Sequence, residues 1–264
     1  MQPAPRRNFL KAAGGLTVGM AAASGLSAIL ASSPKNAEAV AALPWPYQKM
    51  DPVAVAERAY AAYYNGGCMY GAFEGIVGEL RAKVGAPYDT FPAEMMKYGA
   101  AGVAGWGTLC GALNAAAAAI FLLHPPATAN PIISEIFGWY GTESLPNYKP
   151  ASPKFSNIIA TKANSQLCHV SVSIWTTKAG VNATSPERAE RCAWVTAAVA
   201  KYTVEMLNRQ ADKSFKLMHA VPASVTACLS CHGGKGSVGN VHTSNHTTCT
   251  TCHDSAKHPI PLGK

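Results

Sequence analysis

The 264-residue chain has few charged residues. Asp, Glu, Lys and Arg make up only 14% of it and hydrophobic residues 48%, a composition that excludes a disordered protein. It also lacks a basic run with interleaved aromatic side chains, so we do not expect nucleic acid as a partner. No Ser/His/Asp constellation, phosphate-binding glycine loop or pair of carboxylates stands out, so hydrolytic chemistry has no basis. Alanine and glycine dominate many stretches and favour closely packed helices.

The first 39 residues have the features of a twin-arginine signal peptide. Arg6 and Arg7 precede Asn-Phe-Leu-Lys, and a mildly apolar stretch leads to a small-x-small cleavage site at residues 37–39. An amphipathic helix or a membrane anchor is the alternative, but the stretch has no run of large aliphatic residues. We expect cleavage, a periplasmic protein and no stable membrane span. Removal of four of the 22 basic and one of the 14 acidic residues lowers the net charge from +8 to +5.

The rest of the chain divides into a helical domain at 40–215 and a Cys- and His-rich segment at 216–264. The predicted fold class is mainly α, with an irregular C-terminal segment that haem stabilises. Residues 142–162 are Pro/Ser/Asn-rich and predict a surface loop, and 168–175 alternate like a strand but have no partner run and stay unassigned. Helices are expected at 53–64, 68–84, 102–123 and 130–140, and at 186–209 after a Ser185 cap.

Two C-x-x-C-H motifs lie in the C-terminal segment. They read Cys228-Leu-Ser-Cys231-His232 and Cys249-Thr-Thr-Cys252-His253. This spacing lets two thiols bond to the haem vinyl groups while the next residue, His232 or His253, binds the iron as the proximal ligand. The motifs therefore predict two haem c groups per chain.

A zinc site is the main alternative for these motifs, and plain disulfides are a further one. The two cysteine pairs are 17 residues apart, which also satisfies zinc-ribbon spacing. A zinc ribbon needs only the four thiolates, however, whereas both pairs here are followed by histidine. Structural zinc thiolates also belong mainly to reducing compartments, and this chain is expected to be exported.

Each haem iron then needs a sixth ligand or an open site. A second imidazole would give low-spin iron that passes electrons and does not bind substrate. We expect two distal ligands among four histidines of this segment, and we prefer His242 and His258. The four are His242, His258, His246 and His219.

Four further cysteines lie in the helical domain: Cys68, Cys110, Cys168 and Cys192. Haem c is attached after translocation, so twin-arginine export of a folded protein suggests another cofactor inserted in the cytoplasm. Four thiolates are the ligand count of one [2Fe–2S] or [4Fe–4S] cluster. Two disulfides, a redox-switching dithiol, or inert buried thiols are the alternatives that the residues leave open.

The segments around these cysteines resemble the C-GCAxxG-C-C redox family. The matching runs are NGGCMYGAF at 65–73, GTLCGALN at 107–114, CHVS at 168–171 and ERAERC at 187–192. With paired C-x-x-C-H motifs at the C-terminus, residues 47–258 are similar to the split-Soret cytochromes c. This resemblance implies a homodimer with two closely stacked haems per subunit, bis-histidine iron, and a geometry that admits a ligand from the partner subunit.

The sequence therefore predicts a periplasmic electron carrier rather than an enzyme, with redox proteins as its partners. A haem-dependent oxyanion reductase with one five-coordinate iron is the first alternative. A thiol/disulfide redox protein that uses the four cysteines of the helical domain is the second.

Overall fold

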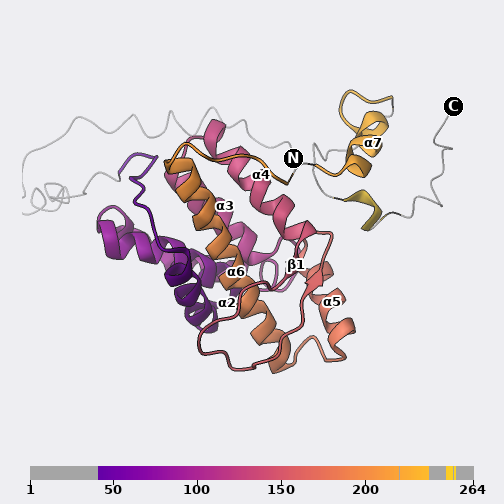
Figure 1. Ribbon diagram of the computed structural model, residues 1–264, viewed down its shortest axis with the longest axis horizontal. Helices are drawn as coiled ribbons and strands as arrows, with labels where there is room; N and C mark the ends of the chain where they lie inside the picture. The colour runs from indigo at the N-terminus through magenta and orange to yellow at the C-terminus, as the bar shows by residue number, and fades with distance from the viewer. Residues whose placement is uncertain (1–40, 220, 238–247, 252, 254–264) are drawn as a thin grey trace, which may run out of the picture. The chain divides into compact units, whose positions relative to one another are not determined.

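The computed structural model describes residues 41–219, 221–237, 248–251 and 253, and its secondary structure is mainly α-helical, as predicted (Figure 1). The predicted signal peptide lies outside the described residues. Within the described part of the chain, no helix is long and apolar enough to cross a membrane. The elements in chain order are α2 (Pro52–Val84), η2 (Tyr88–Thr90), η3 (Ala93–Gly99), α3 (Gly111–Leu123), α4 (Pro126–Thr142), β1 (Ser144–Leu145), β2 (Thr161–Lys162), α5 (Cys168–Ala179), α6 (Pro186–Ala211), α7 (Ala223–His232) and η4 (Cys249–Thr251).

Helix α2 is a pair of helical segments that meet at Gly67. This glycine has φ 80° and ψ −171°, a conformation that interrupts the helix. The second segment folds back and packs closely against the first. A Cβ placed at Gly75 would lie only 2.6 Å from the Ala59 methyl group. The two helices predicted at 53–64 and 68–84 are thus confirmed, with the break where the Asn-Gly-Gly run placed it.

The hydrophobic core lies between α2, α3, α4 and α6, which pack side by side (Figure 1). Helix α6 begins as predicted, with Ser185 Oγ accepting a hydrogen bond from Arg188 N at 3.2 Å and Pro186 in the first turn. Many of its buried residues are alanines, which allow the close approach of α2.

The prediction of one helix over 102–123 was wrong for its first nine residues. Helix α3 begins only at Gly111, and the preceding residues form a left-handed turn. Positive φ occurs at Gly102, Gly105 and Gly107 and also at Ala101, Val103 and Ala104. Glycine adopts positive φ readily, so these glycines favour a turn although the small apolar residues around them suggested a helix. The turn is closed by hydrogen bonds such as the one from Thr108 N to the Gly102 carbonyl at 3.0 Å.

Other boundaries also differ from expectation. Helix α4 starts at Pro126, four residues before the predicted start, because proline is favoured in the first turn. The unassigned run from Cys168 is helix α5, whose left-handed C-cap is Gly180. The predicted loop at 142–162 carries only the short strands β1 and β2 at its two ends.

The C-terminal segment is more regular than predicted. Its first C-x-x-C-H motif lies on the ten-residue helix α7, and the second begins in η4. Residues 223–232 are therefore the helical part of this segment, in a chain whose predicted mainly α fold class is confirmed. Only Val225 of α7 is buried, so this helix has little apolar contact of its own.

Candidate redox centres

The four cysteines of the helical domain line a single cavity of about 20 Å3. Cys68 directly follows the break in α2, Cys110 is the N-cap of α3, Cys168 is the first residue of α5, and Cys192 lies in α6. All four are thiols in this structure and form no disulfide. The structure thus brings together four residues that are spread over 125 positions of the sequence.

Backbone pairing places Cys110 beside Cys168. Cys168 N donates to the Thr108 carbonyl at 2.7 Å, and Cys110 N donates to the Gln166 carbonyl at 2.9 Å. These bonds flank an antiparallel bridge between Leu109 and Leu167. The left-handed turn before Thr108 is therefore part of the site, because it delivers residues 107–110 to the start of α5.

Two glycines leave room for the cysteine side chains. A Cβ at Gly111 would lie 2.6 Å from Cys68 Sγ and 2.5 Å from the Gly99 carbonyl oxygen. A Cβ at Gly102 would lie 2.8 Å from the Cys168 Cβ. Neither position has space for a larger residue, so the small-residue runs around Cys68 and Cys110 serve packing of the site itself.

The surroundings favour one thiolate in particular. A hydrogen bond from the Cys68 thiol lowers the pKa of Cys110 to about 6 although burial opposes the shift. The nearby Tyr140 hydroxyl, the Ala112 N–H and the Arg191 charge act in the same direction as Cys68. The Ala112 N–H belongs to the first turn of α3, where free backbone donors and the helix dipole stabilise an anion. Burial and the neighbouring thiols raise the pKa of Cys168 to about 12.

A buried arginine completes this cavity. Arg191 is only 2% exposed, and its terminal nitrogen donates to Ser171 Oγ at 2.8 Å. Tyr140 donates to the same hydroxyl oxygen at 3.0 Å. The Arg191 Nε is buried and has no hydrogen-bond partner. The cavity therefore combines four soft sulfur ligands with a cation that has an unused donor.

Four cysteines are the ligand count of one iron–sulfur cluster. Among the described residues, no three Cys, His, Asp or Glu side chains converge on one metal position. A cluster distributes its thiolates over two or more irons, and cysteine is its usual ligand. The unpaired Arg191 Nε fits an anionic group of this kind, since a buried donor is normally satisfied.

The C-x-x-C-H motifs form a second candidate centre. Cys228, Cys231 and His232 lie three and four residues apart on α7, so they share one helix face. Helix α7 and η4, which carry the two motifs, contact each other, and burial followed by the nearby Cys228 raises the pKa of Cys249. His253 N donates to the Cys249 carbonyl at 2.9 Å. Cys252 lies outside the described residues, as do the distal candidates His242, His246 and His258.

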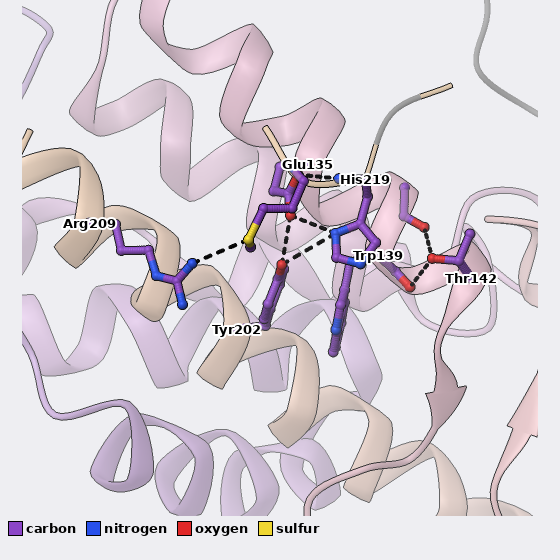
Figure 2. Close-up of polar contacts among 8 residues, drawn as sticks. Glu135, Trp139, Thr142, Tyr202, Arg209 and His219 are labelled. Carbon is purple, nitrogen blue, oxygen red and sulfur yellow. Dashed lines mark hydrogen bonds and ion pairs between the residues drawn. The ribbon is translucent and has the colours of Figure 1, made fainter. Parts of the chain in front are cut away.

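The one distal candidate that the structure describes is His219, and it is held by a buried carboxylate (Figure 2). His219 Nδ1 lies 2.6 Å from Glu135 Oε1, and Glu135 also accepts from the backbone N–H groups of Met218 and His219 at 2.6 and 2.9 Å. The Tyr202 hydroxyl donates to the same Oε1 at 2.7 Å, and the Tyr202 ring stacks on the Trp139 ring. Burial opposes ionisation of Glu135, but these hydrogen bonds hold its pKa below the usual value.

With Nδ1 held by Glu135, the ring of His219 could coordinate a metal through Nε2. A carboxylate that accepts from Nδ1–H places the proton there and leaves the Nε2 lone pair for coordination. Metal-binding histidines commonly have such a partner. His219 was a weaker candidate than His242 and His258 on sequence grounds, because its partner Glu135 lies 84 residues earlier in the chain.

Sequence reasoning also missed Arg191, Tyr140 and Ser171. The one available signal was the run of charged residues immediately before Cys192 in a chain with few charges. Glu190, in the same run, faces a different cluster: it accepts from Trp194 Nε1 at 2.6 Å and from Tyr60 and Tyr64. Which of these charges faces the cysteines depends on how α6 packs.

Four thiols from four helices around a buried cation define a redox-active class of protein, and the sequence comparison agrees with that class. Residues 70–206 match the family described as "Putative redox-active protein (C_GCAxxG_C_C)". The match includes Cys110, Cys168 and Cys192 and starts two residues after Cys68.

The comparison with individual proteins is more specific. Over 263 residues, covering 94% of each chain, the sequence is 37% identical to split-Soret cytochrome c from Desulfovibrio desulfuricans. A solved structure described as showing a novel iron centre in the split-Soret cytochrome c of D. desulfuricans ATCC 27774 matches with a TM-score of 0.75 at 38% identity. That match covers 80% of this chain and 90% of the other. The chain belongs to the split-Soret cytochrome c family, and the predicted resemblance is confirmed.

Proposed function

We propose that this protein is a periplasmic dihaem c-type cytochrome that transfers electrons between respiratory partners, with an additional iron–sulfur cluster in its helical domain. Membership of the split-Soret cytochrome c family supports the redox role. The observation that carries the more detailed proposal is the placement of Cys228, Cys231 and His232 on one face of α7, beside Cys249 of the second motif.

In this proposal the C-terminal segment binds two haem c groups. Cys228 and Cys231 hold one haem and Cys249 and Cys252 the other, with His232 and His253 as proximal ligands. Bound haem supplies an iron that gains and loses one electron. The nearness of Cys228 and Cys249 supports two haems close to each other, since each thiol would bond to the edge of its own macrocycle.

We assign one distal position to His219. Glu135 orients its ring and sets its tautomer, and the side chain is 22% exposed, so its free edge is accessible to a ligand. The second distal ligand is one of His242, His258 and His246. Imidazole on both faces of each iron would leave no open site, which favours an electron carrier over an oxyanion reductase.

The helical domain, in this proposal, holds a [2Fe–2S] or [4Fe–4S] cluster at Cys68, Cys110, Cys168 and Cys192. A bound cluster supplies a further one-electron carrier. The thiol/disulfide alternative is less well supported, because two disulfides are neutral and would leave the buried Arg191 without a negative partner. The twin-arginine motif at residues 6–11 supports periplasmic export after cytoplasmic cluster insertion. The family resemblance supports a homodimer.

The test is a visible spectrum of the oxidised and dithionite-reduced protein, with haem, total iron and acid-labile sulfide measured on the same sample. We expect two haems per chain, low-spin spectra that do not respond to nitrite or sulfite, and iron in excess of haem. A split Soret band would add close stacking of the haems. A colourless protein that contains zinc would refute the proposal, and a high-spin haem that responds to nitrite or sulfite would favour the reductase.

A further inference from the structure

Arg191 carries a buried positive charge without a carboxylate partner. It is 2% exposed, and no ion pair joins it to an acidic side chain among the described residues. Its neighbour in the chain, Glu190, points to Tyr60, Tyr64 and Trp194 instead. An isolated buried charge is strongly unfavourable, so the site must supply negative charge from another source.

The guanidinium is held in one orientation. One terminal nitrogen donates to Ser171 Oγ at 2.8 Å, and that hydroxyl also accepts from Tyr140 at 3.0 Å. The Nε–H is left without a partner although it is buried. Because Arg191 and Ser171 both line the cavity of the four cysteines, this hydrogen-bond donor is available only to an occupant of that cavity or to its sulfur ligands.

Negative charge next to this cation can come only from ionised thiols of the cavity or from a group bound to them, because no carboxylate of the described residues lines the cavity. Four neutral thiols or two disulfides would leave the charge uncompensated. Four thiolates on a [2Fe–2S] or [4Fe–4S] cluster give the oxidised site a negative net charge, and each added electron makes it more negative. A fixed cation beside the site therefore stabilises the reduced state more than the oxidised one.

We propose that Arg191 sets the reduction potential of the cluster. This inference depends on the cluster assigned under the proposed function. In the one-electron step, a ferric ion of the cluster becomes ferrous, with the electron supplied by a reduced c-type haem. Arg191 keeps its proton throughout, and its charge and its Nε–H donor hold the potential higher than the cysteines alone would. It is a positioning and tuning residue, and no iron bond to it is involved.

The experiment is a redox titration of the holoprotein monitored by electron paramagnetic resonance, which reports the cluster and the haems separately. For Arg191→Met we expect the equilibrium constant for one-electron reduction of the cluster to fall at least tenfold, a shift of about 59 mV to lower potential. The haem potentials serve as the internal reference and should stay where they are.

Arg188→Met is the matched control. Arg188 lies one turn earlier on α6, is only partly buried, and its Nε donates to the Ala183 carbonyl rather than to the cavity. Arg188→Met removes the same positive charge, but solvent screens the charge at this partly buried position. The shift in the cluster potential should therefore be several-fold smaller than in Arg191→Met. Arg191→Lys keeps the charge without the Nε–H and should fall between wild type and Arg191→Met.

The outcomes separate the two proposals. A wild-type protein without non-haem iron and sulfide would refute the cluster itself. A wild-type cluster whose potential is unchanged in Arg191→Met, or changed equally in Arg188→Met, would refute the role of Arg191 alone. If Arg191→Met does not retain the cluster, Arg191→Lys and Ser171→Ala decide: both should lower the potential, and wild-type potentials in both would overturn the inference.

Discussion

Replacement of Glu135 by glutamine tests the proposal that Glu135 orients His219 as a distal haem ligand. The wild-type carboxylate accepts four hydrogen bonds, two on each oxygen. The backbone N–H groups of Met218 and His219 can only donate, so they will keep the amide oxygen of the new glutamine. Its NH2 group then faces His219 Nδ1 and the Tyr202 hydroxyl.

Both of these groups can accept a hydrogen bond, but the imidazole does so only if its proton moves to Nε2. Glu135→Gln should therefore fold well while favouring the tautomer that cannot bind iron. Restoring the Nδ1–H tautomer would set two donors against each other, which costs about 1–3 kcal/mol. That energy corresponds to a roughly 5- to 150-fold weaker bond between His219 and the iron.

The assay is the spin state of the haems and their affinity for added imidazole or carbon monoxide. In Glu135→Gln we expect one of the two haems to become partly high-spin and to bind the added ligand, and in His219→Ala to do so completely. Glu205→Gln, which removes the same charge from a partly exposed pair with Lys201, is the control and should leave both haems low-spin. Two fully low-spin, unresponsive haems in His219→Ala would refute the assignment, and the same result in Glu135→Gln would refute the tautomer argument.

The remaining predictions concern stability and cofactor content. Glu190→Ala should lower the free energy of unfolding by about 3 kcal/mol or more in urea titrations, because buried donors including Trp194 Nε1 lose their acceptor. Hydrogen bonds hold the pKa of Glu190 below its usual 4.5 despite burial, so its contribution should be complete above that pH and disappear as the pH falls further; a variant that follows the wild-type acid-unfolding curve would contradict this. Cys110→Ser should lose the non-haem iron but keep two haems per chain, and unchanged iron would exclude Cys110 as a ligand. Gly111→Ala should have a similar, weaker effect in the same iron and sulfide assay, because its methyl group would lie 2.6 Å from Cys68 Sγ; full iron retention would mean that the packing can relax. Cys231→Ala combined with Cys228→Ala should halve the haem content in a pyridine haemochrome assay, and two remaining haems would refute attachment there.

The two candidate centres differ in how the chain builds them. Each C-x-x-C-H motif is complete within five residues, and α7 adds only the helical spacing that puts its two cysteines and histidine on one face. The four-cysteine cavity needs four helices, a left-handed turn and a backbone bridge between Leu109 and Leu167. Loss of tertiary structure should therefore release a cluster while the covalent haems remain attached.

The sequence by itself determined what depends on neighbouring residues. Covalent haem attachment requires two cysteines and a histidine within five residues. The start of α6 depends on Ser185 and Pro186, and the break in α2 depends on Gly67. Each of these features depends on residues only a few positions apart, so it can be predicted from a single sequence. The family resemblance depended in the same way on short runs around the cysteines.

Only the tertiary structure decided the properties that come from distant contacts. The start of α3 at Gly111 follows from glycines that adopt positive φ where the composition suggested a helix. Helix α5 forms because Cys168 and His169 pair with the backbone of residues 107 and 108, a partner that its own alternating pattern does not reveal. The proposed roles of Arg191 and Glu135 are of the same kind. They depend on the burial and orientation of each charge, which arise from packing between helices that lie far apart in the sequence.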